Sequence, residues 1–288
     1  MLTKDTAICI RAIDFSETSQ IVTFFARAAG KISAIAKGSK RPKSAFDGPL
    51  EMFSYGKIVF SDSNKEKLAT LTEFESAYGG AGFSGLSNNL FTMNCCLFGA
   101  ELLNKFTHDY DPHPQLFDDF LQFLVNTQSL ILDSRFSIPD NQSLTSIQQP
   151  CPGVPGFGIE MLALLILFQL SLLKEVGLQP ILSYCVNCKT KYASLACPER
   201  SRREGRKTRD EFYFSSSANG LICRDCEASF PDKLRLTQTA ANCLSNLKLI
   251  AESPEKTLIE IETVLVHHFT ELLGHKPKMA KYILNPSS

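Results

Sequence analysis

Short apolar segments separated by polar breaks make up the first 78 residues. Each segment is rich in Ile, Val, Thr, Phe or Tyr, and Gly, Pro, Asp, Asn or Ser falls at most of the breaks. This pattern predicts β-strands. Five short strands in fewer than 80 residues are typical of a small closed barrel of the OB type. The predicted strands cover residues 4–14, 20–27, 31–37, 55–61 and 67–78.

From residue 89 onward, apolar positions recur at three- and four-residue steps, which predicts helices. The segment 159–176 is apolar nearly all round, so we expect it at the centre of a helical bundle, with Gly177 as its C-cap. Its apolar run of about 15 residues is shorter than the roughly 20 that a membrane span needs. The N-terminus lacks the apolar core of a secretory signal, so we expect a cytoplasmic protein that does not bind membranes. The predicted helices cover residues 90–106, 115–133, 159–176, 237–251 and 255–273.

Two stretches of different composition separate these regions. Residues 79–89, GGAGFSGLSNN, contain a formal match to the G-x-G-x-x-G dinucleotide fingerprint. The strand before it ends a strand-rich unit, and no acid follows at about 20 residues in a second strand. We therefore interpret residues 79–88 as an inter-domain linker. Residues 134–156, with six prolines or glycines and much Ser and Gln, predict a loop.

The chain has ten cysteines but no export signal, which favours metal binding or burial over disulfides. Cys9, Cys95 and Cys96 lie within apolar patterns and are expected to be core thiols. Two C-x-x-C turns can together supply the four thiolates of a tetrahedral, structural zinc site. Redox-active or unliganded thiols are the alternative. The predicted ligands are Cys185, Cys188, Cys223 and Cys226.

The interval between the two C-x-x-C turns is 34 residues, longer than the usual spacing of about 15–20. Within it, residues 197–211 (CPERSRREGRKTRDE) are strongly polar and charged, which indicates a surface insertion. Cys197 belongs to this insertion and is not expected to bind the metal. The basic side chains there form either a phosphate-contacting segment or a solvated loop, and composition favours the loop.

Charge is distributed unevenly along a chain that is neutral overall. Residues 1–60 carry nine cations and five anions, whereas residues 71–133 carry one cation and eight anions. Between residues 31 and 43 no carboxylate accompanies the cations, which suits a surface that contacts a polyanion. The predicted phosphate-contacting cations are Lys31, Lys37, Lys40, Arg41 and Lys43.

Aromatic side chains near this basic stretch are candidates for stacking on bases. Burial in the barrel is the favoured interpretation for Phe24, Phe25 and Tyr55. Phe46 lies in the loop itself and is the one that we expect to contact a base.

No motif for catalysis is present. The chain has no H-E-x-x-H, no H-x-E beside a C-x-x-C, and no Walker A sequence. His267 and His268 lie on an amphipathic segment, where an exposed or half-buried histidine is the ordinary case. A closed shell of four cysteines leaves no position for a reactive water. We therefore expect neither an enzyme nor a small-molecule substrate.

Three stretches resemble the RecO family of bacterial recombination mediators. The first contains Glu17, Phe24, Gly30-Lys31-Ile32 and the segment AKGSKRPKS at 36–44. The others are LLKEVGLQPILSYCVNC at 172–188 and FYFSSSANGLICRDC at 212–226. They occur in the family's order and span nearly the whole chain. The long insertion between the C-x-x-C turns departs from the family pattern.

The resemblance implies an α+β, multi-domain fold: an N-terminal OB barrel and a C-terminal helical bundle with an inserted four-cysteine zinc module. It implies a non-enzymatic, nucleoid-associated role in DNA repair and recombination. The family binds single- and double-stranded DNA, anneals strands, receives the SSB C-terminal tail, and helps RecR to load RecA onto SSB-coated DNA. The expected domains are 1–78 (barrel), 79–88 (linker), 89–182 and 231–288 (helical), and 183–230 (zinc module).

Two other interpretations remain open from the residues. A zinc-containing, OB-fold RNA-binding factor would share the barrel, the C-x-x-C turns and the basic loop. A structural adaptor that binds only proteins would not need the cations of that loop.

Overall fold

A computed structural model of the chain divides it into two compact units, Met1–Val154 and Pro155–Ser288, which we describe separately. Four of the features predicted from the sequence lie wholly or partly outside the described residues: Lys43, residues 79–82 of the predicted linker, residues 137–156 of the predicted loop, and the 197–211 insertion. The described residues are 2–41, 44–46, 48–61, 68–77, 83–136, 157–191 and 212–284.

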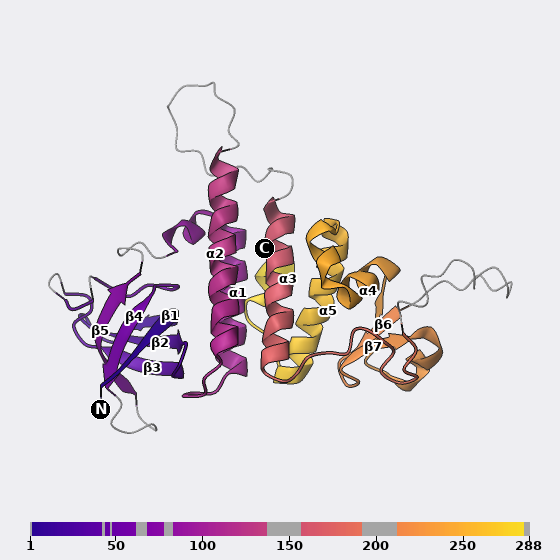
Figure 1. Cartoon of the computed structure of the whole chain (residues 1–288), viewed down its shortest axis with the longest axis horizontal. Helices are drawn as coiled ribbons and strands as arrows, with labels where there is room; N and C mark the ends of the chain where they lie inside the picture. Colours follow the sequence, from indigo (N-terminus) through magenta and orange to yellow (C-terminus); the bar gives the residue numbers. More distant parts are fainter. Residues whose placement is uncertain are drawn as a thin grey trace. The chain divides into compact units, whose positions relative to one another are not determined.

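The first unit contains the predicted five-stranded closed barrel, drawn in indigo in Figure 1. Its strand order is β1-β2-β3-β5-β4, and a parallel pairing of β3 with β5 closes it. Alternating residues of each strand point inward, so Phe24, Ile32 and Phe60 are among the buried core side chains. The strands are β1 (Leu2–Asp14), β2 (Gln20–Ala26), β3 (Gly30–Ala36), β4 (Tyr55–Ser61) and β5 (Ala69–Ser76).

Two long helices belong to the same unit and run side by side in Figure 1. The turn η1 (Ser84–Asn88) leads into α1 (Leu90–Phe106), whose N-cap Asn89 accepts a hydrogen bond from the Thr92 backbone. The second helix is α2 (Pro114–Phe136). Both helices match their predicted positions. The compact unit therefore extends beyond the expected barrel boundary at residue 78.

The barrel packs against these helices through aromatic side chains. The ring of Phe25 lies 6.2 Å from that of Phe117, and the ring of Phe53 lies 6.4 Å from that of Phe120. Gly30 packs so closely on the segment before α2 that an added Cβ would lie 2.3 Å from the Asp111 carbonyl oxygen. Barrel and helices thus share one packed interface within the unit.

The second unit combines a helical core with a small sheet, and the predicted fold class is confirmed. The central helix α3 (Phe157–Glu175) ends at Gly177, which adopts the left-handed conformation with φ +76°, as the C-cap prediction required. The predicted helix 237–251 is broken at Asn246 into two shorter helices. The helices are α4 (Gln238–Ser245), η4 (Leu247–Glu252), α5 (Glu255–Leu273) and α6 (Ala280–Leu284).

The small sheet lies between α3 and α4 in the chain and has the order β7-β6-β8. A short 3-10 helix follows its second strand. The elements are β6 (Phe212–Ser215), β7 (Gly220–Cys223), η3 (Arg224–Ser229) and β8 (Leu234–Leu236). Among the described residues, no helix has both the length and the hydropathy required to span a bilayer.

Candidate functional site

One buried side-chain amide holds the loop that follows β3. Gln20 is only 6% exposed, and its Oε1 accepts hydrogen bonds from the Ser39 hydroxyl and the Leu50 backbone N–H, both at 2.9 Å. Its Nε2 donates to the Leu50 carbonyl at 3.1 Å. The two ends of the segment 39–50 are therefore fixed to the first residue of β2.

The same loop is also attached to the β1–β2 turn. The Lys40 N–H donates to the Thr18 carbonyl at 3.1 Å, and the Gly38 N–H donates to the Ser19 hydroxyl at 3.3 Å. Gly38 has φ +73°, a left-handed conformation that glycine adopts without strain. These contacts hold the backbone at Gly38 and Lys40.

This arrangement places three of the predicted cations together at one edge of the barrel. Lys37 and Arg41 are exposed, and the side chain of Lys40 is 30% exposed. The Lys40 Nζ donates to Asp14 Oδ2 at 2.7 Å. The expectation that no acid accompanies the cations is therefore wrong, because Asp14 reaches Lys40 from the end of β1. Such an ion pair at a surface is weak and is readily exchanged for a phosphate.

Lys31 lies at the opposite end of β3 and has other partners. Its Nζ donates to the carbonyl oxygens of Asn104 and Thr107 at 2.9 and 2.7 Å. It also lies 3.4 Å from Asp109 Oδ1, and its side chain is 11% exposed. Lys31 neutralises the negative end of the α1 dipole, so it leaves the set of predicted phosphate contacts.

Phe46 also leaves the predicted set. Its side chain is 5% exposed and packs in the barrel core, where a base has no access. Phe24 is buried in the barrel core, as expected. Phe25 is also fully buried, but against Phe117 of α2 and not in the barrel core. The loop turns back over the end of the barrel, which is why an aromatic residue within it is buried. The sequence did not reveal Gln20 and Asp14, since their contacts join segments about 20 residues apart or more.

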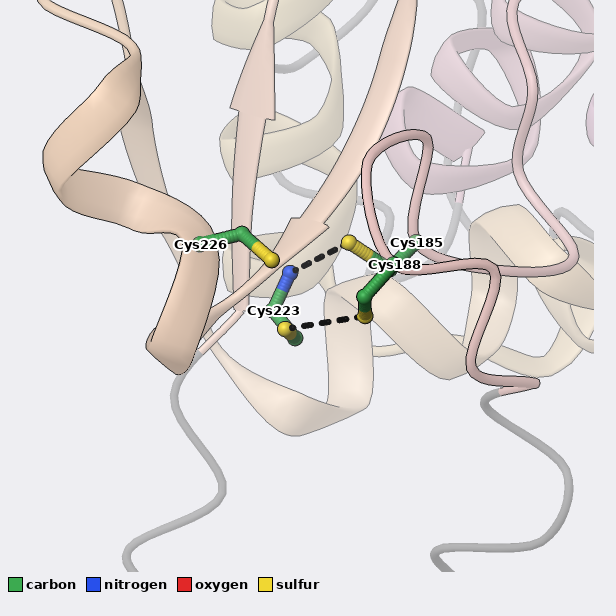
Figure 2. A group of neighbouring side chains, drawn as sticks. All are labelled: Cys185, Cys188, Cys223 and Cys226. Carbon is green, nitrogen blue, oxygen red and sulfur yellow. Dashed lines mark hydrogen bonds between the residues drawn. The ribbon is translucent and has the colours of Figure 1, made fainter.

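The four predicted metal ligands lie together in the second unit (Figure 2). All four Sγ atoms lie within 4.8 Å of one another, and Cys188 Sγ is 3.6 Å from Cys223 Sγ. A tetrahedral ion with metal–sulfur bonds near 2.3 Å requires sulfur separations of about 3.8 Å. The four cysteines could therefore hold a metal ion. Cys9, Cys95 and Cys96 are buried elsewhere, as predicted.

Backbone hydrogen bonds shape the first cysteine turn. The Lys189 N–H donates to the Cys185 carbonyl at 2.9 Å, and Lys189 itself has φ +62°. The turn is joined to β7 by a bond from the Val186 N–H to the Leu221 carbonyl. The Cys223 N–H points at Cys185 Sγ, 3.4 Å away (Figure 2). Backbone N–H groups directed at sulfur favour the thiolate form that a metal requires.

The thiols differ in their acidity. A hydrogen bond with the Thr190 hydroxyl, 3.2 Å away, is the main reason that the pKa of Cys188 is lowered to about 6. Desolvation raises the pKa of Cys223 and of Cys226. A bound cation would reverse this desolvation effect, because it stabilises thiolates directly. The donor set thus fits a metal better than it fits four neutral thiols.

Comparisons with known proteins agree with this architecture. Residues 1–79 match the family model described as "Recombination protein O N terminal", and residues 158–281 match "Recombination protein O C terminal". The DNA repair protein RecO of Bacillus pumilus is 28% identical over 291 residues, covering 98% of this chain and 94% of that protein. That of Bacillus subtilis is 25% identical with the same coverage. That of Salinibacter ruber is 35% identical over 116 residues, or 40% of this chain and 44% of that protein.

The matched regions contain the barrel with its basic loop, and the helical unit with its four cysteines. Together they span most of the sequence, in the order that the resemblance of the three stretches required. This chain therefore belongs to the RecO family of DNA repair proteins.

Proposed function

We propose that the chain is a non-enzymatic recombination mediator that binds single- and double-stranded DNA, anneals complementary strands and, with RecR, helps to load RecA onto SSB-coated DNA. The main support for the proposal is the basic loop that follows β3 and bears Lys37, Lys40 and Arg41. Its segment 39–50 is hydrogen-bonded to Gln20 on a closed barrel, in a chain of the RecO family. Membership of that family supports the partners, including the SSB C-terminal tail. A cytoplasmic, nucleoid-associated location follows from this role.

Loop cations would bind the sugar–phosphate backbone by displacing condensed counterions. Such contacts contain no sequence information, which suits a protein that acts anywhere on a genome. Lys37, Lys40 and Arg41 are the described residues that we assign to this role, and Lys43 is proposed with them. Neutralising two backbones while leaving base edges free is sufficient for annealing, and no bond needs to be made or broken.

We further propose that the four cysteines hold a structural zinc ion. The sulfur separations and the thiolate-favouring backbone N–H group support this assignment. Zinc would supply a four-coordinate link between the 185–188 turn and the β7–η3 segment. With all four ligands from the protein, the ion would leave no position open for substrate.

The proposal is tested by changing the four loop cations together, in K37A/K40A/R41A/K43A. We expect affinity for single-stranded DNA to fall roughly ten- to hundredfold at low salt, and the slope of log K against log salt to become shallower by up to about 3. Fluorescence anisotropy across a salt series measures both. Annealing of SSB-coated complementary strands is the functional readout.

The matched control removes the same charge from elsewhere, in K57A/K248A/K256A/K276A, whose four lysines are all exposed. It should bind and anneal as the wild type does. If the loop variant folds and anneals undiminished, the assignment of the loop is wrong. RNA oligonucleotides bound and annealed in preference to DNA would instead identify an RNA-binding factor, and a chain that binds neither would be a protein adaptor.

A further inference from the structure

The outer face of β1, β2 and β3 consists of rows of side chains that are directly opposite one another. Residues paired across neighbouring strands point to the same face. One row pairs Ile8 with Phe25 and Phe25 with Lys31. All of this row is covered: Ile8 and Phe25 are fully buried, and Lys31 is tied to α1. The helices of the first unit therefore cover this end of the face.

The row at the other end of the same face is open. Ile13 pairs with Ile21, and Ile21 pairs with Ile35. Their strand neighbours Val22 and Ala34 point inward and are fully buried, so the three isoleucines point outward. Ile13 is 41% exposed, and the other two are half-buried. Three aliphatic side chains thus form a continuous exposed strip across three strands.

An exposed aromatic residue lies next to this strip. Phe15 follows β1 directly and is 61% exposed, although its backbone is held by a 3.0 Å hydrogen bond from its N–H to the Ser19 carbonyl. The residue before it, Asp14, binds Lys40. Phe15 is therefore presented on an ordered turn that contacts the basic loop. Phe15 and the isoleucine strip together make an apolar surface patch, and a patch of this kind, unlike a single exposed side chain, indicates a binding site.

The charges around Phe15 identify the class of ligand. Arg11 is exposed on the same outer face, in the row between the covered and the open one. With Lys37, Lys40 and Arg41 it gives four cations, against the two acids Asp14 and Glu17. Cations beside an aromatic and aliphatic platform match the alternation of phosphates and bases in single-stranded nucleic acid. In a duplex the base faces are stacked on one another and cannot reach Phe15.

We propose that Phe15, supported by the Ile13–Ile21–Ile35 strip, is a base-stacking platform that makes the barrel bind unpaired nucleotides in preference to duplex DNA. The inference rests on the proposed function and adds to it the residue that distinguishes single strands from duplexes. The loop cations bind both forms, whereas the platform binds only one.

Phe15→Ala tests the platform without removing charge. We expect affinity for a single-stranded oligonucleotide to fall about 5- to 100-fold, the size of one lost stacking contact. Binding of a duplex of the same length changes less than about twofold, and the salt slope stays at the wild-type value. Circular dichroism and thermal melting show whether the variant is folded, which is expected for a residue so exposed.

Phe15→Trp gives a direct readout, because the chain contains no tryptophan. The indole preserves stacking, so single-strand affinity is retained or increased. Its fluorescence is quenched when single-stranded DNA is added and is little changed by duplex. The matched control is Leu90→Trp, at a 74% exposed position of α1, whose fluorescence should respond to neither. Leu90 is the first residue of α1 and does not belong to the barrel strands that form the platform.

The outcomes distinguish failure of the Phe15 platform from failure of the proposed DNA-binding function. If Phe15→Ala binds single strands as tightly as the wild type while the loop variant loses affinity, the platform is wrong and the loop assignment stands. The exposed strip would then be a protein-docking face. If the wild-type chain binds no DNA at all, both proposals fail.

Discussion

Glu262 shows what burial does to a single carboxyl group. It has no exposed surface, and Gln169 Nε2 donates to its Oε1 at 2.9 Å. No group in the described part of the chain bonds its Oε2. Desolvation is the larger influence and raises the pKa of Glu262 to about 7. The side chain therefore remains a neutral acid in the folded protein well above the pH at which an exposed one ionises.

His268 lies on the same helix as Glu262, and burial shifts its pKa downward, away from the charged form. Its ring is fully buried and packs edge-on against Phe214, 5.2 Å between centroids. Burial lowers the pKa of His268 to about 4, and the neighbouring His267 contributes to the shift. The expectation of an exposed or half-buried histidine at this position is therefore wrong. The amphipathic pattern of the sequence did not predict the burial of His268, because Phe214 of β6 covers the side of α5 that bears it.

These shifts give a pH dependence of stability whose sign can be worked out. Between about pH 4.5 and 7 the unfolded chain releases the Glu262 proton while the folded chain keeps it, so this group favours unfolding as pH rises. Below about pH 6.5 the unfolded chain protonates His268 first, so that group favours unfolding as pH falls. The two oppose each other in the acid range, and Glu262 acts alone near neutrality.

Glu262→Gln removes one of these two influences. We expect the variant to gain stability relative to the wild type on going from about pH 5 to about pH 8, by on the order of 1–3 kcal/mol. Urea unfolding at both pH values measures the difference. Glu271→Gln, at an exposed position of α5, is the control and should show no such change. A pH-independent difference for Glu262→Gln would contradict the buried-acid account.

At the scale of elements, periodicity located the strands and long helices well. Residues 55–61, 90–106 and 255–273 match β4, α1 and α5 at both ends. Closure of the barrel by β3 and β5 could be expected only from the strand count. Local pattern also continued the helix 237–251 through Asn246, where the structure changes to a 3-10 helix. Asn246 itself adopts an extended conformation (φ −135°, ψ 91°), which interrupts the helix.

Docking of the barrel on its helices is another feature that the sequence did not disclose. Gly30 has φ +75°, and its Cα lies against the Asp111 backbone. The Arg27–Asp118 ion pair, at 2.8 Å, crosses the same interface, but its side chains are 52% and 43% exposed and it contributes little. Close backbone approach therefore matters more here than charge.

Gly30→Ala tests whether the close backbone approach at Gly30 stabilises the docking of the barrel on the helices. The new Cβ would lie 2.3 Å from the Asp111 oxygen in a left-handed conformation, so we expect a loss of stability on the order of 2–4 kcal/mol. Gly85→Ala, where a Cβ has no neighbour within 4 Å, is the control and should change stability by less than about 1 kcal/mol. Denaturant titrations compare the two. Equal effects would show that the close approach is not limiting.

At the scale of the whole molecule, the basic loop and the four cysteines belong to different compact units. The net charge of the chain is zero and does not indicate a nucleic-acid partner. Only the cations between residues 31 and 43 indicate one. The family resemblance supplied the partners, which no spacing of residues could specify. The positions of Lys37, Lys40 and Arg41 depend on contacts of their loop with Gln20 and the β1–β2 turn, which only the folded structure shows.

This separation predicts how the molecule responds to loss of metal. We expect about one zinc ion per chain, lost in Cys185→Ser and retained in Cys243→Ser, which changes a cysteine outside the cluster. A strong chelator should lower the melting temperature of the chain but leave affinity for single-stranded DNA within about twofold. Metal analysis, calorimetry and anisotropy measure the three quantities. Loss of DNA binding along with zinc would show that the two functions are coupled.

The bonds of the Gln20 amide have a thermodynamic consequence for ligand capture. Because Ser39 and Leu50 are anchored before any ligand arrives, the main chain at these positions has already lost its freedom on folding. Association then does not have to order the main chain at Ser39 and Leu50, so calorimetry should report a smaller heat-capacity change than the wholly coupled folding and binding of a free segment would give. Gln20→Leu would remove no cation from the loop, but it would remove the bonds to Ser39 and Leu50. The conformational entropy of these positions would then be lost on DNA binding and not on folding.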